Sequence, residues 1–190
     1  MKLVGLALLT ITMGFTNVEK KTIVIDVSHG GKDPGTSFAG FNEKEIALSI
    51  ATKIKKLNTN SNIEIVLTRD SDDYLTLSER TKHINDLKPE FVISLHASSA
   101  SNISESGKKI FISDKNNQKE KSGNLALELF FSFNDQDVEI KKADFYILKN
   151  VEYPIALIEL GYLTNENDRK LLTSEEGQTQ LASSILSVLK

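Results

Sequence analysis

Short runs rich in β-branched residues alternate with longer segments of helical periodicity along most of this chain. A short run of Val, Ile and Phe residues is typical of a buried strand, and strands that alternate with helices favour an α/β domain. The sheet of such a domain is largely parallel, because each helix returns the chain to the same edge. The expected strands are 22–27, 63–67, 91–95, 109–113 and 155–159.

The clearest helical segment spans residues 43 to about 57, where Ile46, Ile50 and Ile54 recur every four residues. That spacing lays one apolar stripe along a helix, which can pack on a sheet. The polar segment 113–123 is expected to be a surface loop. With 190 residues, 39% of them hydrophobic, we predict a single α/β domain: a largely parallel twisted sheet with helices on both faces. Three further helices are expected at 75–87, 123–133 and 178–189.

Composition narrows the classes of partner and cofactor. The chain has 23 basic and 26 acidic residues, and no basic block is long enough to follow a phosphate backbone. We therefore expect no nucleic-acid partner. It has no cysteine, so disulfides, thiolate metal sites and a lipid anchor on cysteine are all excluded. Any metal ion would have to be held by His, Asp or Glu.

The first residues are typical of a signal peptide. Met1 and Lys2 are followed by 13 mostly apolar residues and then by the polar stretch TNVEKK. That run is shorter than the roughly 20 residues that span a membrane, so we expect no stable membrane span. We expect residues 1–17 to be removed on export, with cleavage between Gly14 and Asn17, and residues 21–190 to form the folded domain. The alternative is that the run forms a buried first strand or helix.

Polar residues follow or end three of the expected strands. His29 comes just after the first strand, His96 directly follows FVISL, and Glu159 ends IALIE. Because the carboxyl ends of parallel strands share one edge of a sheet, and ligands bind at that edge, we expect these side chains to lie together. The third histidine, His83, lies among polar residues of a predicted helix, and we expect it at the surface.

Glu43 is the fourth candidate, at the predicted start of a helix. Asn42 is the expected N-cap, with Glu45 as its capping-box partner three residues later. Glu43 would then lie in the first turn, where the helix dipole favours an ionised carboxylate.

Two imidazoles and one carboxylate, from His29, His96 and Glu43, would leave one coordination position for water, as in a catalytic zinc site. Zinc lowers the pKa of bound water to about 7 while a neighbouring carboxylate moves the proton, and Glu159 is the candidate for that base. Taken singly, His29, His96 and Glu43 each have an ordinary structural explanation, whereas Glu159 ends an apolar run and would need a partner if buried. A histidine after a strand is more often packed or solvent-facing than a ligand, and a first-turn glutamate complements the dipole.

Five blocks taken together resemble the zinc-dependent N-acetylmuramoyl-L-alanine amidases of the amidase 3 type, over nearly all of residues 22–189. By this resemblance, His29, Glu43 and His96 match the metal ligands of the family, and Glu159 matches its catalytic acid and base. The blocks are TIVIDVSHGGKDPG, NEKEIALSIATKIKK, TRDSDDYLTLSERTKHIND, FVISLHAS and ADFYILKNVEYPIALIELGYLTNENDRKLL.

The resemblance implies an exported enzyme, periplasmic or extracellular, that uses zinc to hydrolyse the amide between N-acetylmuramic acid and L-alanine in peptidoglycan. We expect a monomer. Several members carry a helical insertion that blocks the site, but residues 97–158 already have to hold a strand, a helix and loops, so we predict none here. Two alternatives remain open: an inactive or weak wall-binding module with an amidase fold, and a zinc peptidase that cuts another amide.

The chain departs from the family pattern at two positions. Ser28 stands where the family has Gly, and Ser98 where it has Asn. Ser28 would deny the backbone the positive φ that Gly allows, and Ser98 removes an amide that could orient substrate. We expect Arg69 and Arg80 to satisfy carboxylate or backbone groups rather than bind the stem peptide, and Asp33 to serve a turn.

Overall fold

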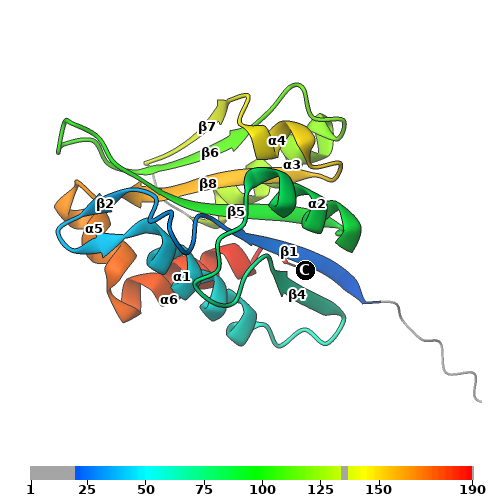
Figure 1. Ribbon diagram of the computed structural model, residues 1–190, viewed down its shortest axis with the longest axis horizontal. Coiled ribbons are helices and arrows are strands. Elements are labelled where there is room, and N and C mark those ends of the chain that lie inside the picture. Colours follow the sequence, from blue (N-terminus) through cyan, green and yellow to red (C-terminus); the bar gives the residue numbers. More distant parts are fainter. Residues whose placement is uncertain (1–19, 134–136, 190) are drawn as a thin grey trace, which may run out of the picture.

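The computed structural model describes residues 20–133 and 137–189, and a six-stranded sheet runs through the described part (Figure 1). Its strand order is β4-β1-β5-β8-β6-β7. The strands β4, β1, β5 and β8 are parallel, whereas β6 runs antiparallel to β8 and parallel to β7. The predicted largely parallel sheet is therefore confirmed, with two reversed strands at one edge. The strands are β1 (Lys21–Val27), β4 (Ile63–Leu67), β5 (Phe91–Ser98), β6 (Lys108–Ile112), β7 (Val138–Lys142) and β8 (Ile155–Tyr162).

Helices cover both faces of the sheet. The helices α1, α3 and α6 pack on one face, and α2 and α4 pack on the other. Figure 1 shows α1 and α6 side by side beneath the sheet. A two-stranded hairpin of β2 (Ser37–Phe38) and β3 (Phe41–Asn42) precedes α1. The helices are α1 (Glu43–Leu57), α2 (Leu77–Leu87), α3 (Lys119–Ser132), α4 (Tyr146–Asn150), α5 (Glu166–Thr173) and α6 (Glu175–Leu186).

The inner strands are apolar on both faces because both faces are covered. In β1, Ile23 and Ile25 point into the core under α1, while Val24 points into the smaller core under α2 and α4. All three are at most 1% exposed. This explains why TIVI is a continuous apolar run rather than an alternating one.

All five expected strands and all four expected helices are present, with ends shifted by a few residues. Five further elements were not predicted: the two-residue strands β2 and β3 of the hairpin, β7, α4 and α5. The sequence of β7, VEIKK, is mostly exposed at the sheet edge, where charged residues are normal and leave no apolar pattern. At five residues, α4 is too short to show helical periodicity.

Two local predictions are wrong. Asn42 precedes α1, but its side chain makes no capping hydrogen bond; it accepts instead from the Ser37 hydroxyl at 2.8 Å. Backbone carbonyls of the preceding loop bind the first amides of the helix, so the box with Glu45 does not form. The segment 113–123 is not wholly a loop, because α3 already begins at Lys119.

The predicted signal peptide, residues 1–17, lies outside the described residues. Among those that the structure describes, no helix combines the length and the apolar character needed to cross a membrane.

Candidate functional site

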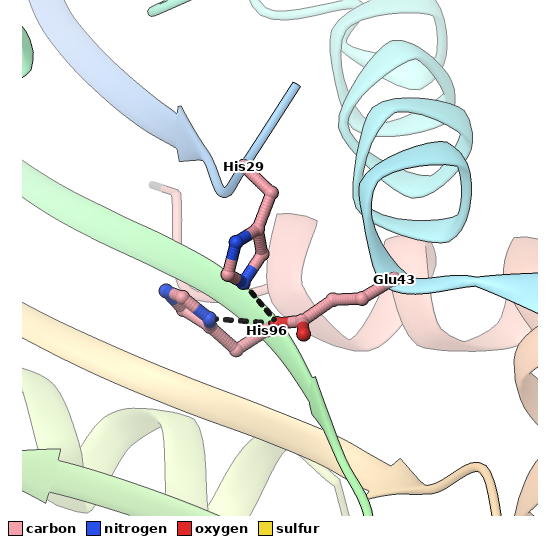
Figure 2. A group of neighbouring side chains, drawn as sticks. All are labelled: His29, Glu43 and His96. Atoms are coloured by element: carbon pink, nitrogen blue, oxygen red, sulfur yellow. Dashed lines mark hydrogen bonds and ion pairs between the residues drawn. The ribbon is translucent and has the colours of Figure 1, made fainter. Parts of the chain in front are cut away.

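Three side chains from separate elements meet beyond the carboxyl end of β1 (Figure 2). His29 comes from the turn after β1, Glu43 from the first turn of α1, and His96 from β5. One possible ligand atom of each lies within 4.8 Å of the others. The structure thus brings together three of the four predicted site residues, although they are up to 67 positions apart in the sequence.

Hydrogen bonds from one arginine, Arg69, fix the turn that carries His29. His29 has a φ of 58°, a left-handed conformation that a residue with a Cβ seldom adopts. The guanidinium of Arg69 donates to the carbonyl of His29 at 2.9 Å and to that of Ser28 at 2.8 Å. It also donates to the carbonyl of Lys44 in α1 at 2.8 Å. Arg69 therefore ties the turn to the start of the helix that carries Glu43.

Asp33 orients the His29 ring. Its Oδ2 accepts a hydrogen bond from Nδ1 of His29 at 2.8 Å, and its Oδ1 accepts from the Gly35 amide at 3.0 Å. With its proton on Nδ1, the ring presents Nε2 toward Glu43 Oε1, 3.1 Å away. Burial alone would lower the pKa of His29, but the carboxylates of Glu43 and Asp33 outweigh it and raise that pKa. From the sequence Asp33 was expected only to serve a turn, and its contact with His29 was not predicted.

Glu43 is the most buried of the three, at 4% exposed. Its Oε2 accepts from the amide of Thr36 at 2.8 Å, and its Oε1 from that of Ala97 at 3.1 Å. Burial would raise the pKa of the carboxyl, but hydrogen bonds with His29 and His96 hold the pKa well below its usual range. Glu43 is therefore ionised at neutral pH, as a metal ligand must be.

The donor set fits a zinc ion. Nδ1 of His96 lies 2.8 Å from Oε1 of Glu43, and Nε2 of His29 lies 3.1 Å from the same oxygen. Ligand atoms at about 2.0 Å from a tetrahedral zinc would be about 3.3 Å apart, so both nitrogens lie within a few tenths of an ångström of the distance from this oxygen that zinc requires. Two imidazoles and one ionised carboxylate are also the chemistry that zinc accepts.

Glu159 lies beside this group rather than in it. It pairs with His96 across β5 and β8, so the two side chains project from the same face of the sheet. Glu159 is half-buried, and burial raises the pKa of its carboxyl. A hydrogen bond from Ser98 works in the opposite direction and lowers it. The net effect is that the pKa of Glu159 is higher than that of an ordinary glutamate. Its carboxyl lies next to His96, a prospective metal ligand.

The two departures from the family pattern have different consequences. Ser28 does not need the positive φ of a glycine, since the left-handed residue is His29 itself. Its hydroxyl, however, is buried and has no hydrogen-bond partner among the described residues. Ser98 is hydrogen-bonded to Glu159, and this bond lowers the pKa of the candidate base.

A buried polar cluster supports the site from the α2 side. The carboxyl of Asp26, fully buried at 0% exposure, accepts from the hydroxyls of Ser94 at 2.6 Å and Thr68 at 3.1 Å. Nε of Arg80 lies 3.4 Å from the same carboxyl. Arg80 and Arg69 thus contact a carboxyl and backbone carbonyls, which agrees with the structural role expected for both. His83 is exposed, as predicted.

Fold and site together define an α/β protein whose sheet edge carries a His-Glu-His group able to hold a metal ion, with a half-buried carboxylate beside it. The sequence profile of the family described as N-acetylmuramoyl-L-alanine amidase matches residues 23–190. The chain belongs to this family, and it is a peptidoglycan hydrolase of the amidase class.

Individual relatives agree with that assignment. The chain is 30% identical over 172 residues to the uncharacterized protein YqiI of Bacillus subtilis, covering 90% of this chain and 84% of that protein. The catalytic domain of CwlV, an N-acetylmuramoyl-L-alanine amidase from Bacillus (Paenibacillus) polymyxa, superposes with a TM-score of 0.81 at 29% identity, covering 89% of this chain and 96% of that domain. An N-acetylmuramoyl-L-alanine amidase from Clostridium difficile superposes with a TM-score of 0.81 at 27% identity, covering 90% of this chain and 95% of that chain.

Proposed function

We propose that the chain cleaves the amide between N-acetylmuramic acid and L-alanine with a zinc ion held by His29, Glu43 and His96, and with Glu159 as general base. The observation that carries the proposal is the convergence of the three ligand atoms within 4.8 Å, with Glu159 paired to His96 on the next strand. Three protein ligands would leave a position for water, which separates a catalytic zinc site from a closed structural one.

Each residue has a definite task. A bound zinc ion would supply an activated water and polarise the scissile carbonyl. Glu159 takes a proton from the attacking water and passes it to the nitrogen that leaves with L-alanine. Asp33 keeps the proton of His29 on Nδ1, so that Nε2 is available as a ligand. The products are a lactyl carboxylate on the glycan and a stem peptide with a free amino terminus.

The test is an identification of products. The protein beginning near residue 20 is incubated with purified peptidoglycan and zinc, and mass spectrometry should find stem peptides that begin with a free L-alanine. A chelator should abolish them, and Glu159→Gln should slow their release by roughly 10²- to 10⁴-fold. Glu64→Gln, which changes an exposed carboxylate on β4, is the matched control and should behave as the unchanged protein. Equal rates for the two variants would remove Glu159 from the mechanism.

The same products separate the alternatives. A wall-binding module would bind peptidoglycan and release no peptide. A zinc peptidase would release fragments cut within the stem. The presence of three convergent ligands and a neighbouring base favours the amidase over the binding module.

We further propose that the protein is exported to the cell envelope, periplasmic or extracellular, that residues 1–17 are the signal peptide, and that the mature domain is a monomer. The substrate supports export, because peptidoglycan lies outside the cytoplasmic membrane. Intact mass measurement of the protein from the cell envelope should show an N-terminus close to residue 17. Light scattering of the purified domain should give a mass near that of one chain.

A further inference from the structure

A lysine lies next to Glu159 on the side away from the His-Glu-His group. Lys109 of β6 pairs with Glu159 of β8, which in turn pairs with His96 of β5. Residues directly opposite one another on neighbouring strands project from the same face of the sheet. The side chains of His96, Glu159 and Lys109 therefore form a row across three adjacent strands. Figure 2 shows β8 beside β5 at the point where His96 leaves the strand.

Contacts position the Lys109 ammonium without neutralising it. Its Nζ is hydrogen-bonded to the hydroxyl of Tyr162 and lies 5.0 Å from the centre of that ring. Tyr162 is itself only 4% exposed, so it is a fixed support. The ion pair of Lys109 with Glu105 is long, 3.9 Å, and the Glu105 side chain is 47% exposed. The hydrogen bond to Tyr162 raises the pKa of Lys109, which is therefore charged at neutral pH.

The simplest structural explanation is that Lys109 only balances the charge of Glu159. A counter-ion would be expected to contact the carboxylate that it neutralises. Lys109 instead bonds to Tyr162, three residues further along β8, and its side chain keeps 19% of its surface exposed. This leaves a half-buried, oriented cation at the edge of the site.

The spacing between Glu159 and Lys109 matches the length of one or two residues of a stem peptide. Neighbouring strands are about 4.8 Å apart, so Lys109 lies about one strand spacing beyond the base that acts at the scissile amide. An extended peptide advances roughly 3.3–3.6 Å per residue. One or two residues of a stem peptide would therefore cover the gap, and the stem peptides of peptidoglycan are acidic.

We propose that Lys109, held by Tyr162, binds a carboxylate of the stem peptide within two residues of the scissile amide and so gives the enzyme a preference for stems whose second residue is a free acid. This inference rests on the proposed function, because it places the scissile amide beside Glu159.

The experiment compares two N-acetylmuramyl tetrapeptides that differ only in whether the carboxylate of the second residue is free or amidated. The unchanged enzyme should prefer the free acid by about tenfold or more in kcat/KM, as expected for a charge-assisted contact, with the difference mainly in KM. Lys109→Met keeps most of the length of the side chain without its charge, and should treat both substrates alike. Lys109→Arg should restore part of the preference. Lys141→Met, on the neighbouring edge strand, is the control and should keep the full preference.

Three results would overturn the inference. These are equal cleavage of both substrates by the unchanged enzyme, an equal loss on both substrates in Lys109→Met, and a full preference retained by Lys109→Met. Calorimetric binding of the two peptides to Glu159→Gln, with and without Lys109→Met, measures the same preference without turnover. If the unchanged protein cleaves neither peptide, the proposed function fails, while the calorimetry still decides whether Lys109 binds the carboxylate.

Discussion

Removing the hydroxyl of Ser28 should stabilise the protein, although Ser28 precedes a prospective metal ligand. The residue is 0% exposed, and its hydroxyl has no hydrogen-bond partner among the described residues. Burying an unsatisfied hydroxyl costs about 1–3 kcal/mol. Ser28→Ala removes that cost and leaves a gap of one atom, which returns a fraction of a kcal/mol. We expect a net gain of about 1 kcal/mol, or a rise in Tm of roughly 2–4 °C for a domain of this size.

A second buried serine provides the matched control. Ser94 is also 0% exposed, but its hydroxyl donates to Asp26 at 2.6 Å. Ser94→Ala should therefore destabilise the protein by about 2 kcal/mol, because it removes a bond to a buried carboxyl. Thermal and urea unfolding of the metal-free proteins would measure both changes. A loss of stability in Ser28→Ala similar to that in Ser94→Ala would refute the reasoning, since it would mean that the Ser28 hydroxyl is bonded.

Three further variants test the geometry of the site. Gly35→Ala should weaken zinc binding with little change in circular dichroism, because the new Cβ would lie 2.5 Å from Oε2 of Glu43 and 2.6 Å from Cδ2 of His29; calorimetry checks it. Asp33→Asn should lower zinc affinity by roughly 10- to 100-fold, since it weakens the bond that orients the His29 ring; unchanged affinity would contradict this role. Glu159 must be ionised to accept a proton and its pKa is raised, so kcat/KM should fall with decreasing pH, with a midpoint above that of an ordinary glutamate. Ser98→Ala removes a bond that lowers the pKa of Glu159, so the acidic limb should move to higher pH, and a shift to lower pH would contradict the assignment.

Much of the fold could be predicted because the inner strands are buried on both faces. The runs at β1, β5 and β8 are apolar for that reason, and α1 shows its stripe of Ile46, Ile50 and Ile54 because it packs on one of those faces. The edge strand β7 is exposed, so its charged sequence carried no such signal.

The convergence of His29, Glu43 and His96 could be predicted from the sequence, but the contacts that support these residues could not. His29, Glu43 and His96 lie at or near the ends of regular elements, and a parallel sheet brings such positions to one edge. The contact of Asp33 with His29 depends on the path of a tight turn. The place of Lys109 beside Glu159 depends on strand order, because β6 inserts antiparallel next to β8. Neither the path nor the order follows from local periodicity.

The most direct test of the central claim is the zinc content of three purified proteins, measured by mass spectrometry of the metal alongside peptidoglycan hydrolysis. The unchanged protein and Glu159→Gln should each hold one zinc ion per chain, and only the unchanged protein should release stem peptides. Glu43→Gln should lose both the zinc and the activity. The account would be contradicted if Glu159→Gln lost its zinc, or if Glu43→Gln kept zinc and activity, because the carboxylates would then have other roles than ligand and base.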